Sequence, residues 1–162
     1  MFAGNMLEIK MKNAIRTILL SLSFLATSPV LAAVPENAAE IKAHLEFMGY
    51  EVSYFKEHML AKHPMHPNFV LGQHASGMIV TKPFKSNAAG KQNRAKLLDI
   101  ANHLNAGALA VRYYIDNEND MVVEAFYPGS YNKQSFSLFI DAFNMMQKQL
   151  EVNLKQLSGY LE

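Results

Sequence analysis

The chain of 162 residues contains no cysteine. Disulfide bonds and thiol chemistry are therefore excluded, and stability must come from packing. The chain also lacks a long apolar run. The segment Thr17–Ala26 is apolar for only ten residues, whereas a helix that spans a bilayer needs roughly twenty. A retained membrane anchor is therefore not expected.

Motifs of known enzyme classes are missing as well. The sequence has no G-x-S-x-G elbow and no H-E-x-x-H pair. The segment AAGKQN at 88–93 lacks the first glycine and the Ser or Thr of a phosphate-binding loop. Asp99 and His103 are spaced i, i+4 on a predicted helix, but without a third group they do not define a triad. We expect a non-catalytic protein, and a small enzyme without a recognisable motif stays open as an alternative.

The N-terminal region has the order of a secretory signal peptide. Lys12 and Arg16 give a positive start, Thr17–Ala26 is apolar, and Val30-Leu31-Ala32 ends in the small residues that precede a cleavage site. We expect cleavage between Ala32 and Ala33. Residue 33 is not cysteine, so lipoprotein attachment is not indicated.

The leader divides the chain into a signal peptide at 1–32 and a domain at 33–162. Residues 1–10 fit a leader poorly and indicate an upstream start codon that is not used. The mature product is expected in the periplasm or outside the cell, with no stable membrane anchor after cleavage. A length of this size suits one domain with one core.

Charge excludes a further class of function. Without the leader, the chain keeps 12 basic and 13 acidic residues, since the leader holds three of the 15 basic and one of the 14 acidic residues. The domain is near neutral and has no basic run. It therefore lacks the cluster of basic residues that binding to nucleic acid requires.

Three segments show helical periodicity, at 36–49, 94–104 and 132–157. Asn93 is placed to cap the second helix. In that helix the predicted buried residues are Leu97, Leu98, Ala101 and Leu104. In the third helix they are Phe136, Phe139, Ile140, Phe143, Met146, Leu150, Leu154 and Leu157.

Strand signals lie between these helices. The predicted strands are 50–55, 68–73, 78–84, 108–116 and 120–128. Alternation places Leu109, Val111, Tyr113 and Ile115 on one face of the fourth. The acidic stretch 116–121 resembles the start of a calcium loop, but Met121 stands where glycine is needed and Tyr127 where glutamate is needed. We therefore predict a hairpin turn there.

These elements predict an α+β domain in which an antiparallel sheet is packed by three helices. The order is helix, strands, helix, β-hairpin and long C-terminal helix. There is no repeat and no low-complexity linker.

The run ANHLNAGALAVRYYIDNENDMVVEAFYPGSYNKQSFSLFIDAF, residues 101–143, resembles the YbjN family, whose fold is that of type III secretion chaperones. The shared pattern is a helix ending at Asn102–Asn105, a strand with Arg112, an acidic turn, a strand with Glu124 and a long aromatic-rich helix. The resemblance covers 94–150 well, while 37–84 matches in element order. It implies a small domain that pairs as a homodimer and binds other proteins. The leader departs from secretion chaperones, which work in the cytoplasm.

A stretch at 58–74, HMLAKHPMHPNFVLGQH, holds four of the six histidines. Its donors suit zinc or copper, and they are His58, His63, His66 and His74, with Met59 and Met65. Pro64 and Pro67 prevent a continuous helix, so a hairpin would have to bring the histidines together. Two interpretations stay open: a metal site, or an exposed polar loop between two strands.

Aromatic residues gather on and after the last predicted hairpin. Tyr113 and Tyr114 must point to opposite faces, so not all of this cluster is core. Aromatic residues are favoured at interface centres. The predicted protein-binding residues are Tyr114, Phe126, Tyr127 and Tyr131, with Arg112 and Glu124 able to pair across the strands. We expect a protein-binding module with an unidentified protein partner.

Overall fold

A computed structural model of the chain describes residues 35–157 and 159–162, and the side chains of 147–156 lie outside this description. The predicted signal peptide at 1–32 falls outside the described residues. No helix in the described part of the chain is both long and apolar enough to span a membrane.

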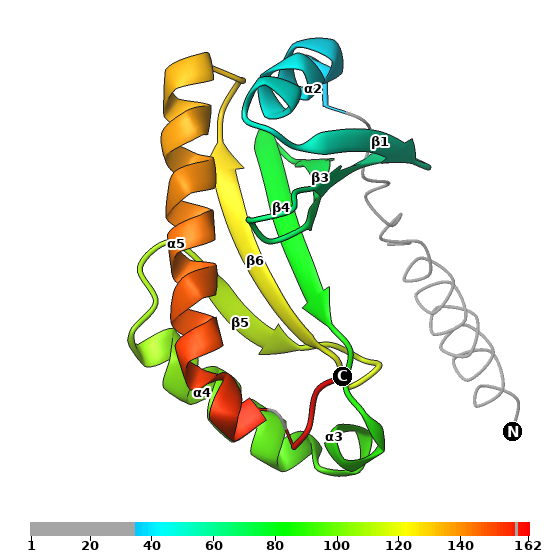
Figure 1. Cartoon of the computed structure of the whole chain (residues 1–162), viewed down its shortest axis with the longest axis vertical. Coiled ribbons are helices and arrows are strands. Elements are labelled where there is room, and N and C mark those ends of the chain that lie inside the picture. Colours follow the sequence, from blue (N-terminus) through cyan, green and yellow to red (C-terminus); the bar gives the residue numbers. More distant parts are fainter. Residues whose placement is uncertain (1–34, 158) are drawn as a thin grey trace, which may run out of the picture. The chain divides into compact units, whose positions relative to one another are not determined.

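Six strands form one antiparallel sheet in the order β1-β2-β3-β4-β6-β5. The strands are β1 (Glu51–Phe55), β2 (His58–Lys62), β3 (Phe69–His74), β4 (Gly77–Phe84), β5 (Arg112–Ile115) and β6 (Met121–Pro128). The first four follow one another as hairpins. The chain then passes through two helices to the far edge and returns as β6 between β4 and β5 (Figure 1).

The described helices are α2 (Ala38–Phe47), α3 (Ala88–Gln92), α4 (Arg94–Ala106) and α5 (Lys133–Leu157). α5 runs along the sheet beside β6, α2 lies at one end of the sheet, and α3 and α4 lie at the other (Figure 1). α2, α4 and α5 all contribute buried residues to the same core as the sheet.

The core forms because alternate strand residues point to one face. We call this the inner face, and its fully or nearly fully buried side chains include Met59, Leu71, Val80, Val123 and Ala125. α5 covers it with the predicted apolar stripe, of which Phe136, Ile140, Phe143 and Leu157 are fully buried. The prediction of an α+β fold with an antiparallel sheet under helices is confirmed.

Several details of the prediction were wrong. β2 lies inside the stretch that was predicted as loop or metal site, because Met59 and Ala61 alternate into the core. The predicted loop at 86–93 contains α3, which Asn87 caps by accepting a hydrogen bond from the Gly90 N–H. On α4, Leu98 is 45% exposed and Ile100 is buried in its place.

β5 is shorter than predicted. It begins at Arg112 because the chain bends at 109–110, and Leu109 is 93% exposed instead of facing the core. Tyr113 and Ile115 lie on one face, as the alternation predicted, and both are buried. The turn to β6 is a hairpin turn, closed by the Asp116 carboxylate, which accepts hydrogen bonds from the Glu118 and Asp120 N–H groups.

Candidate functional site

The face of the sheet opposite the core, which we call the outer face, carries no described helix. It presents apolar side chains of four strands to solvent, with Phe126 47% exposed and Leu60, Val70 and Ile79 half-buried. The register places Ile79 directly opposite Phe126. A sheet face with partly exposed apolar side chains is a surface on which a partner could pack.

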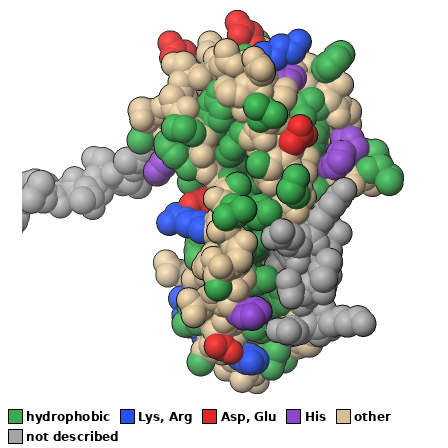
Figure 2. All heavy atoms as spheres, turned by 90° about the vertical axis from the view of Figure 1, so that its left-hand side faces the viewer, with side chains coloured by type: hydrophobic (Ala, Val, Ile, Leu, Met, Phe, Trp, Pro, Cys, Tyr) green, Lys and Arg blue, Asp and Glu red, His purple; other side chains and the backbone are tan. Residues whose placement is uncertain are grey.

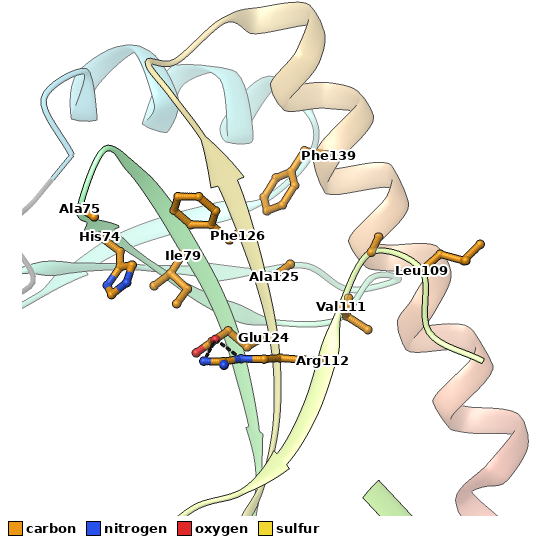
Figure 3. A pocket seen from close by; sticks show the side chains of 11 residues that line it. His74, Ala75, Ile79, Leu109, Val111, Arg112, Glu124, Ala125, Phe126 and Phe139 are labelled. Atoms are coloured by element: carbon orange, nitrogen blue, oxygen red, sulfur yellow. Dashed lines mark hydrogen bonds and ion pairs between the residues drawn. The ribbon is translucent and has the colours of Figure 1, made fainter. Parts of the chain in front are cut away.

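A groove opens at the end of this face, beside β6. We call it the β6 groove, and its volume is about 950 Å³. One wall is β6 with Ala125 and Phe126, and the other is the bent segment 109–111; Phe139 of α5 stands at one end (Figure 3). The remaining lining residues are His74, Ala75, Ile79, Arg112 and Glu124. Most of the lining is apolar, so the groove suits an apolar occupant.

An ion pair closes one end of the β6 groove. Arg112 on β5 and Glu124 on β6 face each other in register, and the Arg112 guanidinium donates to Glu124 Oε1 (Figure 3). The Glu124 side chain is only 10% exposed, whereas that of Arg112 is 68% exposed. The predicted pairing is present, and the arginine covers a carboxylate that would otherwise be buried alone.

Tyr114 completes this cluster. Its hydroxyl donates to Glu124 Oε2 at 3.4 Å, and the Arg112 guanidinium carbon lies 5.2 Å from the centre of its ring. Burial, and then the negative charge of Glu124, raise the pKa of Tyr114. The three side chains therefore hold one another in place on the outer face.

Two further residues of the predicted aromatic cluster lie elsewhere. Tyr127 is buried on the inner face, packs against Phe136, and accepts a hydrogen bond from the Asn132 N–H just before α5. Tyr131 is half-buried and bonds to His44 of α2 at 2.9 Å. The structure thus places Tyr114 and Phe126 on the outer face and the other two tyrosines between the sheet and the helices.

The histidines of 58–74 divide between two places. His63 and His66 lie in the loop between β2 and β3, with ring centres 4.4 Å apart and close to Tyr50. His63 Nδ1 accepts hydrogen bonds from the N–H groups of Met65 and His66, both at 2.9 Å. Burial and the neighbouring His66 lower the pKa of His63. This imidazole therefore orders the loop through one nitrogen and has only Nε2 left for another ligand.

His58 and His74 belong to the outer face. His58 lies over Gly72, where an added Cβ would come within 2.6 Å of its Nδ1. His74 packs edge-on against Phe126, with ring centres 6.2 Å apart. Among the described residues, no three His, Cys, Asp or Glu side chains are grouped closely enough to hold a metal ion. The four histidines are not gathered at one point.

One arrangement that the sequence did not indicate joins α2 to α5. His44 is buried, its Nδ1 lies 2.9 Å from the Tyr131 hydroxyl, and its Nε2 lies 3.0 Å from Ser137 Oγ. Ser137 Oγ donates to the Lys133 carbonyl, as a helical serine does to the turn before it. When Ser137 Oγ makes this bond, His44 Nε2 donates to Ser137 and Nδ1 accepts from Tyr131. These contacts link α2 to Tyr131 and to the first turns of α5.

Apolar side chains are also exposed on the helical side of the molecule. They include Leu98, Leu138 and Met145. Figure 2 shows apolar side chains on this side interspersed with polar and charged ones. Single exposed apolar residues are common on protein surfaces, so the outer face and the β6 groove remain the better candidates.

The sheet order, the antiparallel pairing and the helices on the inner face define an α+β domain of the YbjN fold. The structure is similar to the crystal structure of YbjN, a proposed transcription regulator from E. coli, with a TM-score of 0.60 and 15% sequence identity. The match covers 81% of this chain and 98% of that one. No family model and no curated protein matches the chain. The likeness therefore concerns the fold.

Proposed function

We propose that this chain is an exported, non-catalytic module that binds another protein through the outer face and the β6 groove. The observation that carries the proposal is the groove itself, an apolar hollow of about 950 Å³ beside a partly exposed phenylalanine on a face that no described helix covers. The leader pattern at 12–32 supports export.

The character of the surface fits a protein partner. Interface centres are poor in charge and rich in aromatic residues, and here Phe126 and Tyr114 lie on a face whose groove charges, Arg112 and Glu124, already neutralise each other. The domain also has no basic run to attract nucleic acid.

Site-directed photo-crosslinking in the producing cell tests this proposal. A benzophenone amino acid at Leu109, which is exposed on the groove wall, should give a discrete protein adduct. The matched control is the same amino acid at Phe47, which is 83% exposed on α2 and does not line the groove. Equal adducts from both positions, or none from either, would contradict the proposal. An adduct of twice the chain mass would identify the partner as a second copy.

The predicted export is tested separately by fractionation. The mass of the protein from the periplasm or medium should correspond to a chain that begins at Ala33. A longer species that sediments with membranes would contradict the export proposal while leaving the binding surface untouched.

A further inference from the structure

The two strands at the end of the sheet differ in length. β6 pairs with β4 over its whole length, from Met121 opposite Phe84 to Pro128 opposite Gly77. β5 pairs with β6 only as far as Arg112 opposite Glu124. From Ala125 to Pro128, β6 therefore has a neighbouring strand on one side only.

The direction of the backbone groups on this stretch follows from the ladder. The Gly129 N–H donates to the Ser76 carbonyl at 2.9 Å, one step beyond the last paired residues. In an antiparallel pair, residues bonded to the neighbour alternate with residues bonded to the other side. Ala125 and Tyr127 consequently bond to β4, while the N–H and C=O of Phe126 point away from β4. They face the side that β5 leaves empty, where the β6 groove lies.

The edge of β5 that faces away from β6 is closed. The Asn105 side chain of α4 bonds to both the N–H and the C=O of Tyr113, and Arg94 of the same helix donates to the Ile115 carbonyl. Native proteins cover edge strands in this way to prevent unwanted pairing. These bonds of α4 cover the backbone of β5 at Tyr113 and Ile115, and they do not extend to Phe126 of β6.

The opposite edge is partly closed too. On β1 the outward carbonyl of Val52 accepts a hydrogen bond from Lys42 of α2 at 3.1 Å. The rest of β1 is exposed, so a second copy of the chain that pairs through β1 is an alternative occupant, which the tests below distinguish.

The chemistry of the occupant follows from the lining. Arg112 and Glu124 are already paired, and the rest of the groove is formed by aliphatic and aromatic side chains with one histidine. A charged side chain would lose its hydration there without finding a partner. The open stretch of four residues spans roughly 13 Å, the length of a short extended peptide.

We infer that a short, uncharged, extended segment of the bound protein adds to the sheet as a strand beside Ala125–Pro128. Its backbone bonds to the N–H and C=O of Phe126, and its apolar side chains occupy the β6 groove. This mode of recognition takes its affinity from main-chain hydrogen bonds and its selectivity from alternate side chains. The inference rests on the proposed function and names the kind of segment that this surface holds.

Amide hydrogen exchange of the protein alone is the first test. The Phe126 amide should exchange quickly, while the Ala125 and Tyr127 amides, which bond to β4, should be protected. Protection of Phe126 in the absence of any partner would overturn the inference. If that protection grew with protein concentration, a second copy would be the occupant; if it did not, the chain itself would cover the edge.

The second test adds a defined probe, an eight-residue peptide of alternating valine and threonine. It should slow exchange at Phe126 and leave Ala125 and Tyr127 unchanged. The same peptide with N-methyl groups on alternate amides is the matched control, because it keeps the side chains but loses backbone donors. Equal binding of both peptides, or no effect on Phe126 at millimolar peptide, would overturn the inference.

Two variants of the protein test whether the backbone N–H of residue 126 contributes to peptide binding. Phe126→Ala removes the ring and keeps the N–H, whereas Phe126→Pro removes both, and a proline is tolerated where the N–H faces away from the neighbouring strand. Peptide affinity should be about tenfold lower for Phe126→Pro than for Phe126→Ala, the loss expected for one hydrogen bond. Unfolding temperatures identify any loss of fold, and the N-methyl comparison on the unaltered protein remains decisive if Phe126→Pro does not fold.

The crosslink from Leu109 separates this inference from the proposed function. If Leu109 captures the same protein equally in the Phe126→Ala and Phe126→Pro backgrounds, protein binding stands and strand addition is overturned. If Leu109 captures nothing even in the unaltered chain, the proposed function itself has failed.

Discussion

The side-chain amide of Asn105 hydrogen-bonds to both backbone groups of Tyr113. Asn105 Nδ2 donates to the Tyr113 carbonyl, and the Tyr113 N–H donates to Asn105 Oδ1, both at 2.8 Å. One residue on α4 thus takes the place of a neighbouring strand at the edge of the sheet. The arrangement gives a structural role to Asn105, the last residue of the helix-ending segment Asn102–Asn105.

Asn105→Ala should leave both Tyr113 groups without a partner. We expect a loss of about 1–2 kcal/mol in the free energy of unfolding, together with association that grows with concentration as the β5 edge opens. Asn102→Ala is the control, because Asn102 is exposed on the same helix. Urea denaturation and light scattering measure the two effects. Identical behaviour of the two variants would contradict the role of Asn105.

His44 should make stability depend on pH. Burial, and then the charge of Lys133, lower its pKa below the usual value of 6.5. The unfolded chain therefore binds a proton at a higher pH than the folded one. The contribution of His44 is fully present above pH 6.5 and is lost as the pH falls through the folded-state pKa.

Unfolding free energies measured between pH 7.5 and 5 should fall toward acid in the unaltered chain and fall less in His44→Gln. His103→Gln, at an exposed position on α4, is the control for the loss of a histidine. The slope of His103→Gln should match that of the unaltered chain. A His44→Gln slope equal to the unaltered one would show that His44 does not carry the dependence.

Arg112→Ala should destabilise the fold by leaving the Glu124 carboxylate buried without its partner. We expect about 1–3 kcal/mol, most of which should return in the double variant with Glu124→Gln, since the amide needs no counter-charge. Lys96→Ala is the control, because the Lys96–Asp99 pair is well exposed on both sides and such pairs contribute little. Additive effects of the two changes in a double-mutant cycle would rule out coupling.

Gly90→Ala should disturb the C-terminal residues. A Cβ at Gly90 would lie 2.3 Å from the Tyr160 carbonyl oxygen, which accepts a hydrogen bond from the Asn87 N–H. Both groups belong to backbone and cannot move aside cheaply. We expect a loss of about 1–3 kcal/mol and faster exchange of the Asn87 amide. Gly107→Ala meets nothing within 4 Å and should be neutral, so a similar cost at both positions would contradict this prediction.

Periodicity predicted the elements that bury one face along their whole length. α5 is the best case, because its stripe of Phe136, Ile140 and Phe143 repeats at intervals that only a helix brings to one side. β2 was missed for the opposite reason. Its histidine and lysine ends and the prolines beyond it outweigh Met59 and Ala61, the two residues of β2 that reach the core.

The geometry of the candidate site could not be predicted from the spacing of residues in the sequence. The alternation of 108–116 predicted one continuous strand, but the bend at 109–110 ends the pairing at Arg112 and so creates the groove. For the histidines, the sequence provided the donor atoms but not the distances between them, which depend on strand register. The pairing of Arg112 with Glu124 was predicted correctly, because direct cross-strand neighbours need only the register of one hairpin.

The position of β6 in the sheet has a consequence for the kinetics of folding. β1 to β4 pair with neighbours in sequence, and so do β5 and β6, so each of these two groups can form locally. The pairing of β4 with β6 joins them, and it requires closure of the whole segment from Phe84 to Met121, which carries α3 and α4. Such closure costs entropy before any contact is gained. We expect the pairing of β4 with β6 to limit the folding rate. Val80→Ala in β4 should therefore slow folding, whereas a change such as Ser53→Gly in β1 should mainly speed unfolding.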